Sequence, residues 1–220
     1  ATGTSAATIS RPAEAATVRG ESPDRLIMNA RCVGHDVVGH GFSAYERELK
    51  DLLQGDRSAV LRYSKTIEPT ERPDLERIIA EPFLVIRGAG SLGFDLVALR
   101  GVFALPLEVK ASSEPTIHFS AASGRASEQL EAHVSAVEKV GLVAVYAYRR
   151  IGHRGGDAWR LFSAARQPQR GSLGLLARRL PAVERTREGH AVLRWDHGMP
   201  LVRFFATVHT LLEPVALVPP

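Results

Sequence analysis

The stretch Gly93-Phe-Asp-Leu-Val-Ala98, followed by Leu107-Glu-Val-Lys110, decides the fold of this chain. Asp95 closes a Gly-rich turn, and thirteen residues later a strand-like run delivers Glu108 and Lys110. Successive side chains of a strand point to opposite faces, so Glu108 and Lys110 share one face. Two carboxylates and an ammonium group are therefore expected to meet at one end of a hairpin.

The opposite face of this strand-like run is apolar throughout and suits a buried core. Its members alternate with the charged positions and are Phe103, Leu105, Leu107 and Val109. Two carboxylates between buried strands can hold a divalent cation and a water molecule beside a phosphodiester. The pattern therefore indicates a metal-dependent nuclease, and the alternative is a salt-bridged surface hairpin.

Length and composition place the chain among globular proteins. Its 220 residues, 45% of them hydrophobic, are enough for one domain with extensions. No apolar run is long enough to cross a bilayer, so no membrane partner is expected. Cys32 is the single cysteine, which excludes an internal disulfide and argues against a thiolate zinc site. We expect a cytoplasmic, nucleoid-associated protein.

Positive charge is concentrated in the second half of the chain. Residues 147–220 contain 12 arginines and 5 acidic residues, whereas residues 1–146 contain 16 basic and 19 acidic residues. Arginine outnumbers lysine 24 to 4. Arginine suits phosphate contacts, and a GC-rich coding sequence produces the same bias. The excess of arginine therefore indicates either a polyanionic partner or a GC-rich coding sequence.

The beginning of the chain is predicted to be a flexible tail over residues 1–40. Its first 25 residues lack the continuous apolar segment of a secretory signal. A helix is then predicted from a cap at Ser43 to about Gln54, ended by Gly55.

An insertion at residues 55–82 follows, with an apolar segment at 59–63 and a short helix predicted over 74–80. Three strand-like runs come next, at residues 83–87, 95–99 and 103–110, and their short linkers predict a meander. Pro106 removes one backbone donor from the third run, which predicts an edge position or a bulge there.

A second helix is predicted over residues 128–140, capped by Ser127 and ended by Gly141. Two strands at 142–148 and 158–163 then pair across a Gly-Gly turn. The order of elements predicts an α/β protein with a mixed central β-sheet flanked by helices.

The predicted organisation has three parts. The tail over 1–40 precedes a nuclease core over 41–165, which contains the 55–82 insertion. A basic C-terminal extension over 166–220 packs on the core, and its scattered apolar pairs predict added strands or a short helix.

The run Gly88-Ala-Gly90-Ser-Leu-Gly93 matches the dinucleotide fingerprint, with Glu108 twenty residues after its first glycine. That fingerprint needs a helix to open at its third glycine. A strand pattern interrupted by Gly101 and Pro106 follows instead, so a tight turn beside a bound backbone is favoured. The histidines are not assigned to a metal site.

Three segments, taken together, are specific enough to indicate a family. They read Ala44-Tyr-Glu-Arg-Glu-Leu-Lys50, Arg87-Gly-Ala-Gly-Ser-Leu-Gly-Phe-Asp-Leu-Val-Ala98 and Leu107-Glu-Val-Lys110. With the helix and paired strands that follow, residues 43–163 resemble the archaeal-type Holliday junction resolvase family, a branch of the PD-(D/E)xK nuclease superfamily. The resemblance covers a little over half of the chain and implies a restriction-endonuclease-like core.

By this resemblance the catalytic residues are Glu46, Asp95, Glu108, Lys110 and Ser91. Asp95 and Glu108 would hold Mg²⁺ through hard oxygen ligands, with Mn²⁺ as a substitute. Glu46 would bind a second metal ion or accept a proton through water. Lys110 would orient the attacking water and offset charge on the phosphate.

DNA contacts are expected at Arg47, Arg87, Arg149 and Arg150, as positioning contacts to phosphates. A four-way junction has two-fold symmetry, so paired nicks that leave 5′-phosphate ends call for a homodimer. Apolar residues of the helix over 128–140 or of the last paired strands are candidate dimer contacts. The alternatives are a PD-(D/E)xK nuclease for another DNA structure and a non-catalytic junction-binding protein.

Overall fold

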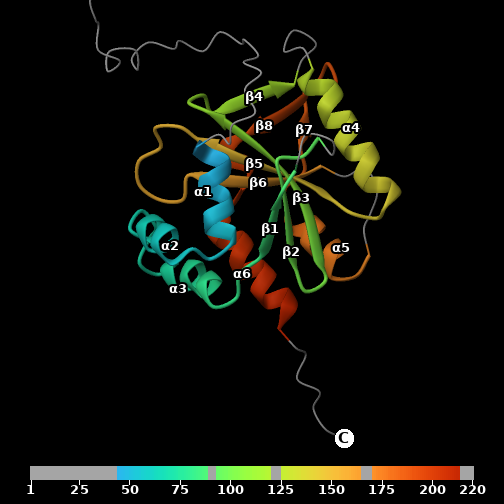
Figure 1. Cartoon of the computed structure of the whole chain (residues 1–220). Coiled ribbons are helices and arrows are strands. Elements are labelled where there is room, and N and C mark those ends of the chain that lie inside the picture. The colour runs from blue at the N-terminus through green and yellow to red at the C-terminus, as the bar shows by residue number, and fades with distance from the viewer. Residues whose placement is uncertain (1–43, 89–92, 120–124, 165–169, 214–220) are drawn as a thin grey trace, which may run out of the picture. The chain divides into compact units, whose positions relative to one another are not determined.

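The computed structural model of the chain describes residues 44–88, 93–119, 125–164 and 170–213 (Figure 1). The predicted tail over 1–40 lies outside these residues, and so do the predicted cap Ser43 and the predicted site residue Ser91. No helix among the described residues is long and apolar enough to cross a membrane.

Among the described residues, the central sheet has six strands. Their order across the sheet is β1 (Leu84–Arg87), β2 (Leu96–Arg100), β3 (Phe103–Ser112), β5 (Ala144–Arg150), β6 (Trp159–Ala164) and β9 (Met199–Pro200). The predicted meander is confirmed, because β1, β2 and β3 pair antiparallel in that order. The short linkers between these runs leave no room for a crossover helix, which parallel pairing would require.

The second half of the sheet makes it mixed. β5 runs parallel to β3, and the connection between them contains a helix. β6 and β9 are then added antiparallel. The architecture is therefore the α/β fold with a mixed central sheet that the sequence predicts.

The edge position predicted for Pro106 is confirmed locally, although β3 is a central strand of the sheet. Pro106 is paired with Val97 of β2. The ladder between β3 and β5 begins one residue later, at Leu107. At Pro106 the strand therefore has a neighbour on one side, which is where a missing backbone donor is tolerated.

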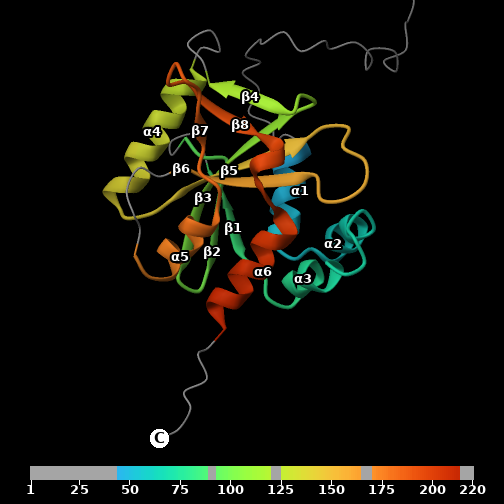
Figure 2. The same ribbon diagram turned by 180° about the vertical axis from the view of Figure 1, so that it is seen from behind.

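One face of the sheet is covered by helices from both ends of the described chain. They are α1 (Ala44–Leu53), α2 (Arg57–Ser64), α3 (Arg72–Glu76), α5 (Gly171–Arg179) and α6 (Leu201–Leu212). Their apolar side chains form one buried cluster with strand residues such as Leu96, Leu105 and Val145. Figure 2 shows α6 lying between α3 and α5. The larger part of the core therefore lies on this face.

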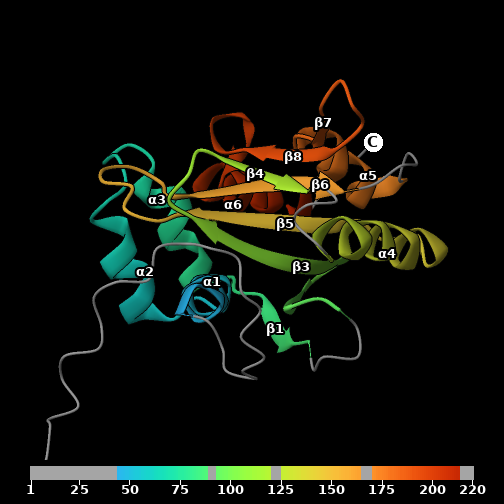
Figure 3. The same cartoon turned by 90° about the horizontal axis from the view of Figure 1, so that it is seen from above.

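The other face carries α4 (Ala126–Lys139) and a small antiparallel sheet. The strands of that sheet are β4 (Thr116–Phe119), β8 (Ala191–Arg194) and β7 (Glu184–Arg185). A second buried cluster joins them to Tyr146 and Tyr148 of β5. Seen from above, β4 and β8 lie beside β5 and β6 on the side away from α1 (Figure 3).

The predicted helices are present, with different boundaries or caps. α4 begins at Ala126, so Ser127 lies inside the helix, and no side chain caps its first turn. The predicted Ser127 cap was therefore wrong. The apolar segment at 59–63 lies within α2, which is capped by the Asp56 carboxylate accepting from the Ala59 N–H at 2.8 Å. The helix predicted over 74–80 is α3 followed by the 3₁₀ turn η2 (Arg77–Ile79).

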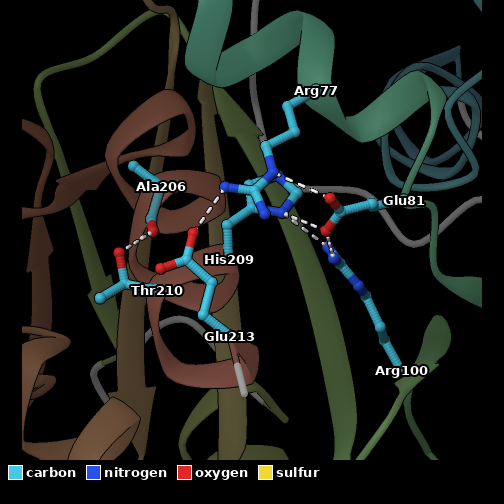
Figure 4. A network of polar contacts seen from close by, with 7 residues as sticks. All are labelled: Arg77, Glu81, Arg100, Ala206, His209, Thr210 and Glu213. Carbon is cyan, nitrogen blue, oxygen red and sulfur yellow. Dashed lines mark hydrogen bonds and ion pairs between the residues drawn. The ribbon is translucent and has the colours of Figure 1, made fainter. Parts of the chain in front are cut away.

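A polar network ties the insertion at 55–82 to the last helix (Figure 4). Arg77 donates to Glu81 and to Glu213, each at 2.9 Å. Arg100 of β2 and His209 of α6 both contact the second oxygen of Glu81. The insertion and the C-terminal extension therefore contact each other and β2 of the meander.

Candidate active site

Asp95 is positioned by close approach of two backbone segments. The Gly88 N–H donates to the Asp95 carbonyl at 2.9 Å, and the Asp95 N–H donates to the Leu107 carbonyl at 3.1 Å. A Cβ on Gly88 would lie 1.7 Å from the Phe94 carbonyl oxygen, and Gly93 has a φ of +74°. Only glycine fits both requirements. Strand β2 follows Gly93, so the dinucleotide-binding alternative is excluded.

The Asp95 carboxylate is held in place and is partly desolvated. Its Oδ2 accepts from the Val109 N–H at 2.7 Å. Burial raises the pKa of Asp95 to about 6, and the negative charges of Glu108 and Glu46 act in the same direction. Asp95 is therefore close to both other acids of the predicted site.

Glu108 is a buried carboxylate with one unsatisfied oxygen. Its side chain is 3% exposed, and its Oε1 accepts from Lys110 Nζ at 2.7 Å. No hydrogen-bond partner reaches Oε2 among the described residues. Burial raises the pKa of Glu108, and the Lys110 ammonium and the nearby Gln129 amide oppose that rise, although no donor in the described part of the chain meets hydrogen-bond geometry at Oε2. A buried, unpartnered carboxylate oxygen is unfavourable for folding unless a ligand satisfies it.

Lys110 lies between the carboxylates and α4. Its Nζ also donates to Gln129 Oε1 at 3.1 Å. The predicted sharing of one strand face by Glu108 and Lys110 is thus present, with their charges in direct contact. Gln129 was not predicted as a site residue, and nothing in its sequence surroundings distinguishes it from other polar positions of the helix.

Glu46 reaches the same region from α1. Its charge contributes to the raised pKa of both Asp95 and Glu108. The apolar face of α1 packs on the sheet through Leu49 and Leu53, which directs its first turn toward the cluster. Glu46 is therefore close enough to Asp95 and Glu108 for its charge to act on both carboxylates.

A histidine that the sequence interpretation set aside supports the Gly-rich turn. His133 of α4 is buried, and burial lowers its pKa, so the imidazole is neutral at neutral pH. Nε2 donates to the Gly93 carbonyl at 2.6 Å, so Nδ1 accepts from the Tyr146 hydroxyl at 2.9 Å. The ring also stacks on Phe94 at 4.0 Å. His133 shares a helix face with Leu130 and Val134, and this spacing was the available signal.

Of the four predicted DNA-binding arginines, Arg47 and Arg149 line the same pocket, whereas Arg87 and Arg150 lie elsewhere. Arg47 of α1 and Arg87 of β1 are exposed. Arg149 contacts Glu48 at 3.2 Å and lies over the Tyr45 and Trp159 rings on the α1 face. Arg150 points to the opposite face.

There the Arg150 guanidinium lies 5.3 Å from the centre of the Trp195 ring. Consecutive residues of a strand alternate between faces. Arg149 and Arg150 therefore lie on opposite faces of the sheet.

The acidic cluster fits a hard divalent cation held by two carboxylates. Mg²⁺ is commonly bound by one or two carboxylates while it retains several waters. Asp95 and Glu108 supply these, and the free Glu108 Oε2 is a suitable ligand atom. Among the described residues, no three His, Cys, Asp or Glu side chains are close enough to share one metal ion. Glu46 is thus an electrostatic neighbour of the pair and does not complete a set of three ligands.

Comparison with solved structures shows a structural similarity. The chain is similar to Archaeoglobus fulgidus Hjc, a Holliday junction resolvase from an archaeal hyperthermophile, with 22% sequence identity and a TM-score of 0.40. The match covers 66% of this chain and 96% of that chain. Neither a protein-family model nor a curated protein matches this chain.

Proposed function

We propose that this protein is a Mg²⁺-dependent, structure-selective DNA endonuclease that resolves four-way junctions by paired symmetric nicks. The observation that carries the proposal is the buried Glu108 carboxylate, whose Oε2 has no partner among the described residues although Asp95 and Lys110 lie beside it. A purely structural ion pair would satisfy both oxygens. The sequence resemblance of residues 43–163 supplies the substrate class.

Each residue of the cluster has a role that its surroundings support. Asp95 and Glu108 would hold the cation, and a bound Mg²⁺ supplies positive charge to phosphate oxygens and lowers the pKa of water. Lys110 would orient the attacking water and offset the charge that develops on the phosphate. Glu46 would accept a proton through water or bind a second cation. Ser91 keeps its proposed role by resemblance alone.

The homodimer is part of the proposal, because a two-fold symmetric junction requires two sites for paired nicks. The candidate contacts on α4 are used within the chain, since Leu130, Val134 and Val137 are buried in its own core. Leu84 and Ile86 of the edge strand β1 are 62% and 50% exposed. An edge strand with apolar side chains is a suitable surface for a second copy of the chain.

The test uses a synthetic four-way junction, a linear duplex and a single strand, each with Mg²⁺ or EDTA. Symmetric paired nicks on the junction alone, dependent on Mg²⁺, are expected. Cutting of the linear duplex would assign the protein to another DNA structure. Binding of the junction without cutting would make it a non-catalytic binding protein.

The matched variant is Asp95→Asn, which keeps the shape of the side chain. It should abolish cutting while junction binding in EDTA stays within about twofold of the unmodified protein. Loss of both cutting and binding would argue against the assigned role of Asp95.

A further inference from the structure

A pocket of about 570 Å³ lies between α1, α2 and the turn that joins β5 to β6. Figure 1 shows that turn extending beyond α1 and above α2, on the side away from α4. The pocket has a floor of apolar side chains: Leu52, Ala59, Tyr63 and Ala158. Its volume is in the range of ligand sites. The insertion at 55–82 supplies four of the thirteen lining residues: Ala59, Arg62, Tyr63 and Thr66.

The rim of the pocket carries arginines from three elements, which are Arg47 of α1, Arg62 of α2 and Arg149 of β5. Arg149 is already paired with Glu48, whose charge it neutralises at 3.2 Å. Arg47 and Arg62 are exposed, and neither makes a hydrogen bond or ion pair within the described part of the chain.

Asp51 is the remaining charged group of the lining, and it lies 3.9 Å from Lys50. The three arginines thus outnumber the two carboxylates of the lining, and two of the guanidinium groups are available for an anion.

α2 is held rigidly enough to keep this pocket open. The Tyr63 hydroxyl donates to Asp157 Oδ1 at 2.7 Å and accepts from the Ala158 N–H at 2.9 Å. The Gly156 N–H donates to the Thr66 carbonyl at 2.7 Å. Because α2 is fixed to the β5–β6 turn before any ligand arrives, binding needs little ordering of the protein.

The position of the pocket connects it with the acidic cluster. α1 carries Glu46 toward the carboxylates and Arg47 toward the pocket, so one ten-residue helix, about 15 Å long, joins the two sites. Guanidinium groups above apolar side chains can bind a sugar–phosphate segment. The phosphate would contact the arginines at the rim, and the sugar would contact the apolar floor.

We infer that this pocket is a phosphate-binding site for the DNA backbone, in which Arg62 of the insertion and Arg47 clamp a strand entering beside the cleavage centre. The inference rests on the proposed function, because it assigns the site to the same DNA substrate. α2 thereby adds a contact outside the catalytic cluster and fixes how a DNA arm crosses α1.

The test measures junction binding in EDTA at several salt concentrations for Arg62→Ala, with Arg57→Ala as the matched control. Arg57 is an exposed arginine of the same helix that does not line the pocket. Arg62→Ala should weaken binding roughly 3–10-fold. The plot of log association constant against log salt concentration, which has a negative slope, should become less steep by about 0.9. For the Arg47→Ala/Arg62→Ala double variant the same plot should become less steep by about 1.8. Arg57→Ala should change neither the affinity nor the salt dependence.

Other outcomes separate the two proposals. If Arg62→Ala binds the junction as Arg57→Ala does, the pocket inference is overturned even when the protein cuts junctions. If the protein cuts no DNA with Mg²⁺ but binding in EDTA still depends on Arg62, the nuclease proposal fails and the pocket stands.

A third arm titrates deoxyadenosine monophosphate and follows the melting temperature. If the nucleotide raises the melting temperature of the unmodified protein but not of Arg62→Ala, while both proteins bind the junction equally well, the pocket binds a free nucleotide. That result would overturn its assignment to DNA. Because Arg62 is exposed, unchanged melting of the variant without ligand confirms that the fold is intact.

Discussion

Two buried carboxylates of this protein, Asp157 and Glu108, differ in how their oxygens are satisfied. Asp157 Oδ1 accepts from the Tyr63 hydroxyl and the Trp159 N–H, and its Oδ2 accepts from the Val202 N–H at 2.8 Å. Glu108 has Lys110 on one oxygen and no partner on the other within the described residues. The two side chains are 7% and 3% exposed.

The difference supports a structural role for Asp157 and the proposed functional role of Glu108. Burial raises the pKa of both groups, so a shifted pKa alone does not distinguish them. A carboxylate whose two oxygens both accept hydrogen bonds holds chain segments together, as Asp157 does for α2, β6 and α6. An open oxygen beside a second acid and a lysine is a site that a cation and a phosphate can complete.

The largest effect is expected for Glu108→Gln. Cutting of the junction should fall about 10³-fold, as for removal of one preorganised group that stabilises charge. The free energy of unfolding should stay within about 1 kcal/mol or rise, because a buried charge is removed. Single-turnover cleavage and urea unfolding measure the two quantities. A strongly destabilised variant would place Glu108 in the same structural class as Asp157.

Asp157→Ala should show the reverse pattern. Three donors lose their acceptor, so the free energy of unfolding should fall by about 3–5 kcal/mol. The urea midpoint reports this loss. Cutting per folded molecule should change little, since Asp157 lies outside the acidic cluster. Full stability in this variant would contradict the structural role.

The pH dependence of stability sharpens the same comparison through Asp95. Its pKa of about 6 in the folded state lies above the unfolded value of about 3.9. The contribution of Asp95 to stability is therefore fully present below about pH 4 and is lost as the pH rises through 6.

In EDTA, the free energy of unfolding of the unmodified protein, relative to that of Asp95→Asn, should fall by on the order of 2 kcal/mol between pH 4 and 7, after allowance for partial exposure. Urea titrations of both proteins across this range give the difference. A constant difference across the range would show that Asp95 is not desolvated.

The smallest effect is expected for His133→Gln, which removes the link from Tyr146 to the Gly93 turn. As a positioning residue, His133 should affect the cation that Asp95 helps to hold. The Mg²⁺ concentration for half-maximal cutting should rise roughly tenfold, as for other outer-shell partners. Val134→Ala is the control for a loss of packing on the same helix face, and it should leave that concentration unchanged.

The strand meander and the convergence of Asp95 with Glu108 were predictable, because short linkers force neighbouring strands to pair. The antiparallel register then places the start of β2 opposite the later part of β3. α1 and α4 were predictable from the spacing of their apolar residues. These features depend on local patterns only.

The missed features depend on distant segments. His133 reaches Gly93 across 40 residues, and no local pattern records that bond. The edge position of Pro106 within a central strand arises because the ladder to β5 starts at Leu107, which requires the register. The placement of Arg149 and Arg150 on opposite faces, by contrast, follows from strand alternation and was available from the sequence.

The bonds of Asp157 also order events during synthesis of the chain. They join residue 63 to residue 157, and residue 157 to residue 202. α1 and the meander are complete at Ser112, whereas α6, the helix that completes this junction, begins only at Leu201. A translation product that ends before residue 157 would therefore lack the acceptor of the Tyr63 hydroxyl, and with it a bond that holds α2 beside the proposed phosphate-binding pocket.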